Sequence, residues 1–227
     1  INGRCPIEVT IKKTNSPSIE LASTDIGSHK EFTNIVELQD CTNHNDSFAL
    51  HKAALIACGI IPYKEEISVK EITDKLGGGL YMNTRVIDIP KGSGLGTSSI
   101  LAGACVKGLY EFLGIALEDN DLYNRVLCME QIMSTGGGWQ DQVGGLAKGI
   151  KMVTSELGLK QEITCTPLNV SPSTIDELDN RFAIIYTGQR RLARNLLREV
   201  VGKYIGCEKS SLEALYEIQR IAVLMRF

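Results

Sequence analysis

Apolar and polar residues alternate over several short stretches of the chain, and a period of two predicts β-strands that bury one face. Near the start the alternation covers residues 5–12 and 18–24, which Asn15-Ser16-Pro17 separates. A polar separator that contains proline favours a turn, so we expect an antiparallel hairpin here. The other predicted strands cover residues 32–38, 80–89 and 182–187, and a second hairpin is predicted from 149–154 and 160–166.

Apolar residues three or four positions apart predict helices elsewhere. The predicted helices cover residues 48–58, 68–76, 98–113, 118–133, 190–202 and 210–226. Asp46 or Ser47 can cap the first of them, because short polar side chains accept hydrogen bonds from the unpaired N–H groups at a helix start. The helix over 98–113 is rich in small residues and has a mediocre intrinsic propensity, so we expect it to be buried against a neighbour.

A run of glycines and hydroxyl residues lies between the strand that ends at Ile89 and the helix that follows. The run consists of Pro90, Lys91, Gly92, Ser93, Gly94, Leu95, Gly96, Thr97, Ser98 and Ser99. Glycine at every second position lets backbone N–H groups approach a ligand, and the start of a helix attracts anions. We therefore predict a phosphate-binding loop, which is not a Walker A loop because no Gly-Lys-Ser/Thr closes it.

Several side chains of this loop have two interpretations. Thr97 and Ser99 can contact phosphate oxygens or cap the helix, and Lys91 can contact a phosphate or only solvent. Gly92, Gly94 and Gly96 allow the close approach of a phosphate, and Ser98 is the residue of this loop that we assign to a metal ion.

Two carboxylates further along the chain can complete a phosphoryl-transfer site. At about 100° per residue, Glu130 falls on the apolar arc of its helix, where a carboxylate is costly unless it is paired or holds a metal. Asp141 follows a run of glycines and Trp139, in a loop suited to close approach by a ligand. The alternatives are that Glu130 reaches solvent at the helix edge and that Asp141 is a turn residue.

Phosphoryl transfer requires a phosphate cradle, a site for a hard cation, and a carboxylate near the accepting hydroxyl group. The three segments supply these parts. We predict that Ser98 and Glu130 hold Mg²⁺, which needs few protein ligands, and that Asp141 is the catalytic base.

Composition and charge describe an ordinary globular protein, with 43% hydrophobic and 22% charged residues. A net charge of −3 gives no support to attraction for nucleic acid or for a membrane surface. No apolar run approaches the roughly 20 residues of a membrane span. The seven cysteines form no C-x-x-C pair, so we expect reduced thiols in a cytoplasmic protein.

The segment over residues 89–99 resembles the second signature of the GHMP kinases, which include galacto-, homoserine, mevalonate and phosphomevalonate kinases. In that family the last hydroxyl of the corresponding motif helps to hold Mg²⁺, which implies this role for Ser98. A second magnesium carboxylate lies eleven residues before the catalytic aspartate, and Glu130 and Asp141 have this separation.

The resemblance implies a two-domain α+β fold. Residues 1–170 would form the N-terminal, ATP-binding domain, which is like domain 2 of ribosomal protein S5. Residues 171–227 would begin the C-terminal α/β-sandwich domain. The polar link at Ser171-Pro172-Ser173 marks the predicted boundary.

Within the family, residues 90–104, 136–146 and 186–195 resemble L-fucose kinases, and the resemblance covers most of the chain. It implies transfer of the ATP γ-phosphoryl group to the anomeric hydroxyl of L-fucose, in the salvage route to GDP-fucose, with ATP and Mg²⁺ as cofactors. The substrate residues that it implies are Gly138, Trp139, Asp141, Thr187, Gly188 and Arg190.

Other interpretations remain open. Heptose kinases share the Gly-Gly-Trp-Gln-Asp-Gln element over 137–142, so a kinase for a heptose or another sugar is one alternative. A non-catalytic sugar sensor on the same fold is another. Arg190, Arg194 and Arg198 form a stripe that can be a solvated basic face as well as part of the sugar site.

The first and last family signatures are absent, and the chain begins with Ile1 and ends at Phe227 inside a predicted helix. We therefore expect a fragment of a longer protein, with little activity by itself. Some fucose-kinase-like proteins are fused to a nucleotidyltransferase, and the parent of this chain can be of that kind. The expected partners are a sugar and ATP, with neither nucleic acid nor membrane.

Overall fold

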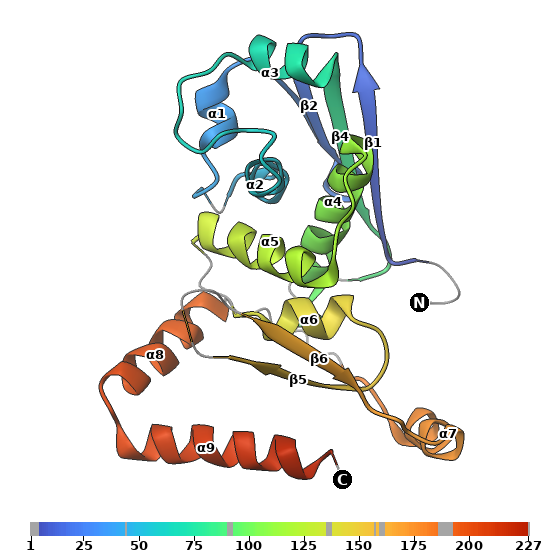
Figure 1. The fold of residues 1–227 in the computed structure, drawn as a ribbon, viewed down its shortest axis with the longest axis vertical. Helices are drawn as coiled ribbons and strands as arrows, with labels where there is room; N and C mark the ends of the chain where they lie inside the picture. Colours follow the sequence, from blue (N-terminus) through green and yellow to red (C-terminus); the bar gives the residue numbers. More distant parts are fainter. Residues whose placement is uncertain are drawn as a thin grey trace. The chain divides into compact units, whose positions relative to one another are not determined.

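The computed structural model describes residues 5–43, 45–89, 93–134, 138–156, 158, 162–185 and 193–226. It divides into two compact units, residues 1–146 and residues 147–227. The first unit holds a four-stranded sheet covered by helices, and the second holds a two-stranded hairpin with three helices in its described part (Figure 1). The division falls after Leu146, and the domain limits expected from the sequence, 1–170 and 171–227, stay a prediction.

The sheet of the first unit has the strand order β1-β4-β2-β3. Its strands are β1 (Ile7–Thr14), β2 (Ile19–Ser23), β3 (Ser28–Phe32) and β4 (Gly79–Val86). β4 is antiparallel to β1 and parallel to β2. The predicted hairpin between the first two strands is therefore wrong, although both strands exist. The hairpin that does form pairs β2 with β3, through the short helix η1 (Thr24–Ile26).

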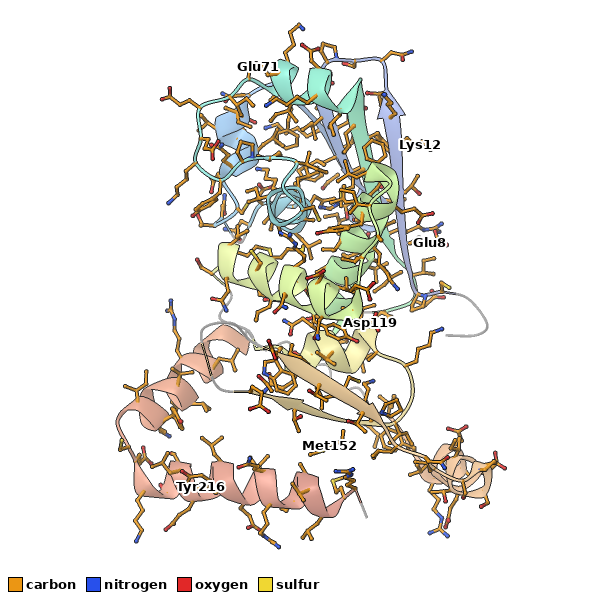
Figure 2. All side chains as sticks on the ribbon, viewed as in Figure 1. Glu8, Lys12, Glu71, Asp119, Met152 and Tyr216 are labelled. Atoms are coloured by element: carbon orange, nitrogen blue, oxygen red, sulfur yellow. The ribbon has the colours of Figure 1, made fainter. Side chains whose placement is uncertain are left out.

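Burial explains why β4 takes the central position between β1 and β2. Leu80 and Met82 of β4 have no exposed surface, and neither do Ile19 and Leu21 of β2. The edge strand β1 instead alternates between half-buried and exposed residues, and Figure 2 shows Glu8 and Lys12 pointing away from the helices. The alternation thus identified β1, β2 and β4 correctly, but β4, the strand that pairs with both others, lies far away from them in the sequence.

Gly79 allows β4 to enter between the ends of its two neighbours. A Cβ at this position would collide with the carbonyl oxygen of Ser16 and lie 2.7 Å from the carbonyl oxygen of Ser18. Gly79→Ala is expected to lower the free energy of unfolding by roughly 3 kcal/mol, because both carbonyls belong to the bend that joins β1 to β2 and that of Ser18 accepts a hydrogen bond from the Leu80 N–H. Chemical denaturation followed by circular dichroism measures the change.

Gly108→Ala is the matched control for Gly79→Ala in the same unit. The closest atom to a Cβ at Gly108 would be Cδ1 of Ile11, at 3.0 Å, and this end of a flexible side chain can shift. Equal losses of stability in the two variants would contradict the role given to Gly79.

The helices of the first unit agree with the sequence in most places. They are α1 (Ile35–Gln39), α2 (Ala49–Ala57), α3 (Val69–Leu76), α4 (Thr97–Leu113), α5 (Asp119–Ile132) and α6 (Gln140–Leu146). The strand predicted over 32–38 is wrong, since β3 ends at Phe32 and Asn34 caps α1 by accepting a hydrogen bond from the Val36 N–H. Asp46 accepts from the Phe48 N–H, but Phe48 itself is the N-cap of α2.

A buried histidine ties α2 to the sheet. His51 is 3% exposed, and its Nε2 lies 3.0 Å from the carbonyl oxygen of Ala22 and 2.9 Å from Oγ1 of Thr84. Because a carbonyl oxygen only accepts, Nε2 carries a proton and donates it. Burial lowers the pKa of His51 from 6.5 to about 4, so the imidazole is neutral at physiological pH.

Acidification is expected to destabilise the protein through His51. In the unfolded chain His51 takes up a proton at its ordinary pKa of 6.5, whereas in the folded chain its pKa is about 4. This contribution is fully present above pH 6.5 and is lost as the pH falls through this window. Between pH 7 and 5 we expect a loss of roughly 2 kcal/mol in the free energy of unfolding, measured by denaturation at both values.

Two histidine variants test the origin of this pH dependence. His51→Gln is expected to remove the loss, whereas His29→Gln is expected to keep it, because the His29 side chain is 59% exposed. A pH dependence that survives in His51→Gln would show that other groups cause it.

The second unit contains β5 (Lys151–Ser155), β6 (Ile163–Pro167), α7 (Pro172–Arg181), α8 (Ala193–Ile205) and α9 (Lys209–Leu224). The predicted second hairpin is confirmed, since β5 and β6 pair antiparallel. The polar link at 171–173 instead begins α7, which Ser171 caps by accepting from the Thr174 N–H. The buried strand predicted over 182–187 is wrong over 182–185, where Phe182 and Ile185 are 74% and 84% exposed. Residues 186 and 187 lie outside the described residues.

Candidate active site

The glycine-rich loop is described from Ser93 onward, and Pro90, Lys91 and Gly92 lie outside the described residues. Gly94 and Gly96 have φ angles of 77° and 65°, in the left-handed region that glycine adopts at little cost. A Cβ at either position would meet nothing within 4 Å. The backbone conformation, rather than crowding inside the protein, therefore requires glycine here, and the open space beside both residues suits a ligand.

The hydroxyl groups of the loop differ in exposure. Oγ of Ser93 and Oγ1 of Thr97 are buried without a hydrogen-bond partner among the described residues, Ser99 is 4% exposed, and Ser98 is exposed. α4 begins at Thr97 with Gly96 as its N-cap and no side-chain capping bond, so the capping role considered for Thr97 and Ser99 is not observed. Unpaired buried hydroxyls cost about 1–3 kcal/mol each, so this loop fits a polar ligand such as a phosphate.

Glu130 lies on the buried side of α5. Its exposure is 8%, and its neighbours Met129 and Val126 have no exposed surface. The alternative of a solvent-facing glutamate is therefore wrong, and the arc predicted from the sequence is confirmed. Its role as a magnesium ligand with Ser98 stays a prediction. Over the described ranges, no group of three or more His, Cys, Asp or Glu side chains could hold a metal ion.

Asp141 lies in the first turn of α6, where the sequence predicted a loop. The helix forms because its inward side is anchored: Gln142 and Val143 are 1% and 0% exposed, and the Val143 N–H donates to the carbonyl oxygen of Trp139. Asp141 itself is exposed, as a base that meets a substrate must be. Gly138 is exposed and Trp139 is half-buried at the entrance to this helix.

Close contacts hold α6 against α4. A Cβ at Gly145 would lie 2.6 Å from Cγ1 of Ile100, and a Cβ at Gly103 would collide with the side chain of Leu146. Small residues on both helices thus permit the close packing that the sequence indicated for residues 98–113. α5 also packs against α4 and α6, so the structure places the helices that carry Ser98, Glu130 and Asp141 in one group (Figure 1).

The predicted substrate residues near the end of the chain are not placed. Thr187, Gly188 and Arg190 lie outside the described residues. Arg198 of α8 is exposed, in agreement with a solvated basic face. Their contribution to a sugar site stays a prediction.

An open pocket of about 340 Å³ lies beside the end of β4, and the sequence did not predict it. Its walls are Thr24, Asp25, Arg85, Val86, Ile87 and Asp88. Oδ1 of Asp25 accepts a hydrogen bond of 3.3 Å from the Val86 N–H, and Asp88 has a φ angle of 57°, which is unusual for a residue other than glycine. The one signal in the sequence was Asp88, a charged residue between Ile87 and Ile89 immediately before the loop.

Residues 64–149, which include the glycine-rich loop, Glu130 and Asp141, match the family described as GHMP kinases N terminal domain. The chain is 36% identical over 98% of its length to a bifunctional fucokinase/GDP-fucose pyrophosphorylase from Arabidopsis thaliana. It is 34% identical over 99% of its length to an L-fucokinase/L-fucose-1-P guanylyltransferase from Bacteroides fragilis. A D-glycero-alpha-D-manno-heptose 7-phosphate kinase from Campylobacter jejuni is 30% identical over 61% of the chain.

The chain spans 20%, 24% and 40% of the length of these three relatives, respectively. Among solved structures, a D-glycero-D-manno-heptose 1-phosphate kinase from Bacteroides thetaiotaomicron matches with a TM-score of 0.52 and 22% identity. The match covers 76% of this chain and 51% of that one. This likeness confirms the α+β fold that the sequence predicts. The family match over residues 64–149 and the two fucokinase relatives, which match nearly the whole chain, show that the chain belongs to the GHMP kinase family.

Proposed function

We propose that this chain is the ATP-binding part of an L-fucose kinase, which transfers the γ-phosphoryl group of ATP to the anomeric hydroxyl of L-fucose. We choose L-fucose as the sugar because of one observation, the extent of the match to each relative. The fucokinase relatives match 98% and 99% of the chain at 36% and 34% identity, whereas the heptose kinase relative matches 61% of it at 30% identity.

Each part of the candidate site has a role in this reaction. The loop from Pro90 to Ser99 binds the phosphates of ATP, through backbone N–H groups and the Ser93 hydroxyl, which has no partner among the residues described. Ser98 and Glu130 would hold Mg²⁺, whose charge offsets the negative charge of the phosphates when it is bound. Asp141 accepts the proton of the attacking sugar hydroxyl.

We assign the sugar site to residues from the segment before α6 and from the last part of the chain. We assign Gly138 and Trp139 to the sugar site because they precede Asp141 directly, and Thr187, Gly188 and Arg190 from the resemblance to fucose kinases. An indole ring that is half-buried beside the base can pack against the apolar face of a sugar.

We also propose that the parent protein carries a nucleotidyltransferase. Both fucokinase relatives have a second activity in their names, and the chain spans only 20% and 24% of their lengths. A cytoplasmic location is proposed with it. Among the described helices, none is both long enough and apolar enough to cross a membrane.

A sugar panel with the full-length protein tests the proposal. ATP, Mg²⁺ and either L-fucose or a heptose phosphate are supplied, and ADP release and the sugar phosphate are measured. We expect L-fucose to be phosphorylated with a kcat/KM at least about 100-fold above that of the heptose phosphate. Preference for the heptose phosphate would assign a heptose kinase, and sugar binding without any ADP release would indicate a sensor.

A further inference from the structure

Two polar atoms on the packed helices α4 and α6 are buried without a hydrogen-bond partner among the residues that the structure describes. They are Oγ1 of Thr97, the first residue of α4, and Oε1 of Gln142 in α6. Gln142 is 1% exposed, so solvent does not compensate for the missing bond. Buried polar groups are almost always paired in native proteins, so two unpaired atoms on neighbouring helices require an explanation.

The two residues lie close in sequence to the contacts between the packed helices α4 and α6. Gly145 lies against Ile100, and Gly103 lies against Leu146. Residues three apart share a face of a helix. One turn before Ile100 is Thr97, and one turn before Gly145 is Gln142.

The two groups are chemically complementary. The hydroxyl of Thr97 can donate a hydrogen bond, and Oε1 of Gln142 is an acceptor. One bond between them would satisfy both atoms. If α6 needed only an anchor in the interior, Val143 already provides one, and an apolar side chain in place of Gln142 would cost less than an unpaired carboxamide.

We propose that Thr97 and Gln142 are a positioning pair of the kinase. In the substrate-bound enzyme the Thr97 hydroxyl donates to Oε1 of Gln142, and this bond fixes α6 and with it the carboxylate of Asp141, the residue before Gln142. Because Thr97 belongs to the glycine-rich loop and begins α4, the binding of ATP to the loop orients the base. The inference rests on the function proposed above.

The positioning role differs from a direct phosphate contact by Thr97. A hydroxyl has one proton, so Thr97 cannot donate both to a phosphate oxygen and to Gln142. With a phosphate contact, Thr97 and Gln142 would act independently. With the positioning bond, removing either partner removes the same interaction, and their effects are coupled.

A double-mutant cycle on kcat/KM of the full-length protein tests the pair. Thr97→Val, Gln142→Leu and the double variant are compared with the wild type for ATP- and sugar-dependent ADP release. We expect each single variant and the double variant to lose about tenfold, mainly in kcat, whereas independent residues would lose about 100-fold together. Thr97→Ser keeps the hydroxyl and is expected to retain activity within about twofold.

Binding and stability separate positioning from a structural defect. The affinity for Mg·ADP is expected to change by less than about twofold in Gln142→Leu, and its thermal midpoint is expected to equal or exceed that of the wild type. If the loss of kcat/KM in the double variant equals the product of the two single losses, or if Thr97→Ser has low activity, the positioning pair is wrong. A wild-type protein without phosphoryl transfer to any sugar would instead overturn the proposed function.

Discussion

Asp141→Asn is expected to lower the kcat of the full-length kinase by about 10³-fold, because the amide cannot accept the proton of the sugar hydroxyl. The loss should appear in kcat more than in the KM for either substrate, since the amide has the same size and keeps most contacts. Asp141 is exposed in the first turn of α6, so the substitution leaves the buried anchors of that helix untouched. Steady-state ADP release at saturating ATP and sugar measures the effect.

Asp119→Asn is the matched control, because Asp119 is also an exposed aspartate in the first turn of a helix, α5 (Figure 2). Both substitutions remove one negative charge that interacts favourably with the helix dipole. Only the change at residue 141 should affect turnover. An Asp141→Asn enzyme with more than about a tenth of the wild-type kcat would refute the assignment of the base.

Glu130→Gln is expected to lower kcat/KM about 100-fold at 1 mM Mg²⁺ and to shift the half-saturating Mg²⁺ concentration upward about tenfold. The amide keeps the shape of the side chain but loses the charge that attracts the cation. Because Glu130 is 8% exposed, little solvent competes with the metal for this carboxylate. A titration of activity with Mg²⁺ measures both changes.

Glu111→Gln serves as the control for Glu130→Gln, since Glu111 is an exposed carboxylate on α4. Its removal tests whether the general loss of negative charge alters the response to Mg²⁺. Identical Mg²⁺ titrations for the wild type and Glu130→Gln would exclude Glu130 as a ligand of the metal.

The local elements of the fold could be predicted because their signals lie within short stretches. The capping box of Ser68 and Glu71 at the start of α3 is an example, since both hydrogen bonds form within four residues. Strand pairing could not be predicted in the same way. Whether β1 pairs with β2 or with β4 depends on which strand is most apolar and on the space that Gly79 leaves, and neither fact is local.

The candidate site shows the same division between local and distant causes. The burial of Glu130 followed from the helical period, and the positive φ angles of Gly94 and Gly96 agree with the glycine pattern. The helix that carries Asp141 was missed because its sequence, Gln-Asp-Gln-Val-Gly-Gly-Leu, has low intrinsic helix propensity. Packing of Gly145 against Ile100 compensates for that deficit, and no sequence pattern reveals such a contact.

The position of β4 has a consequence for the order in which the sheet can assemble. β2 and β3 are joined within residues 19–32, whereas among the described strands β1 pairs with β4, through pairs such as Thr14 with Gly79 and Ile7 with Val86. During synthesis, β1 therefore cannot form this pairing until residues 79–86 have left the ribosome. Closing so long a segment is slow compared with forming a hairpin, and until then the apolar side of β1 is available to chaperones or to other chains.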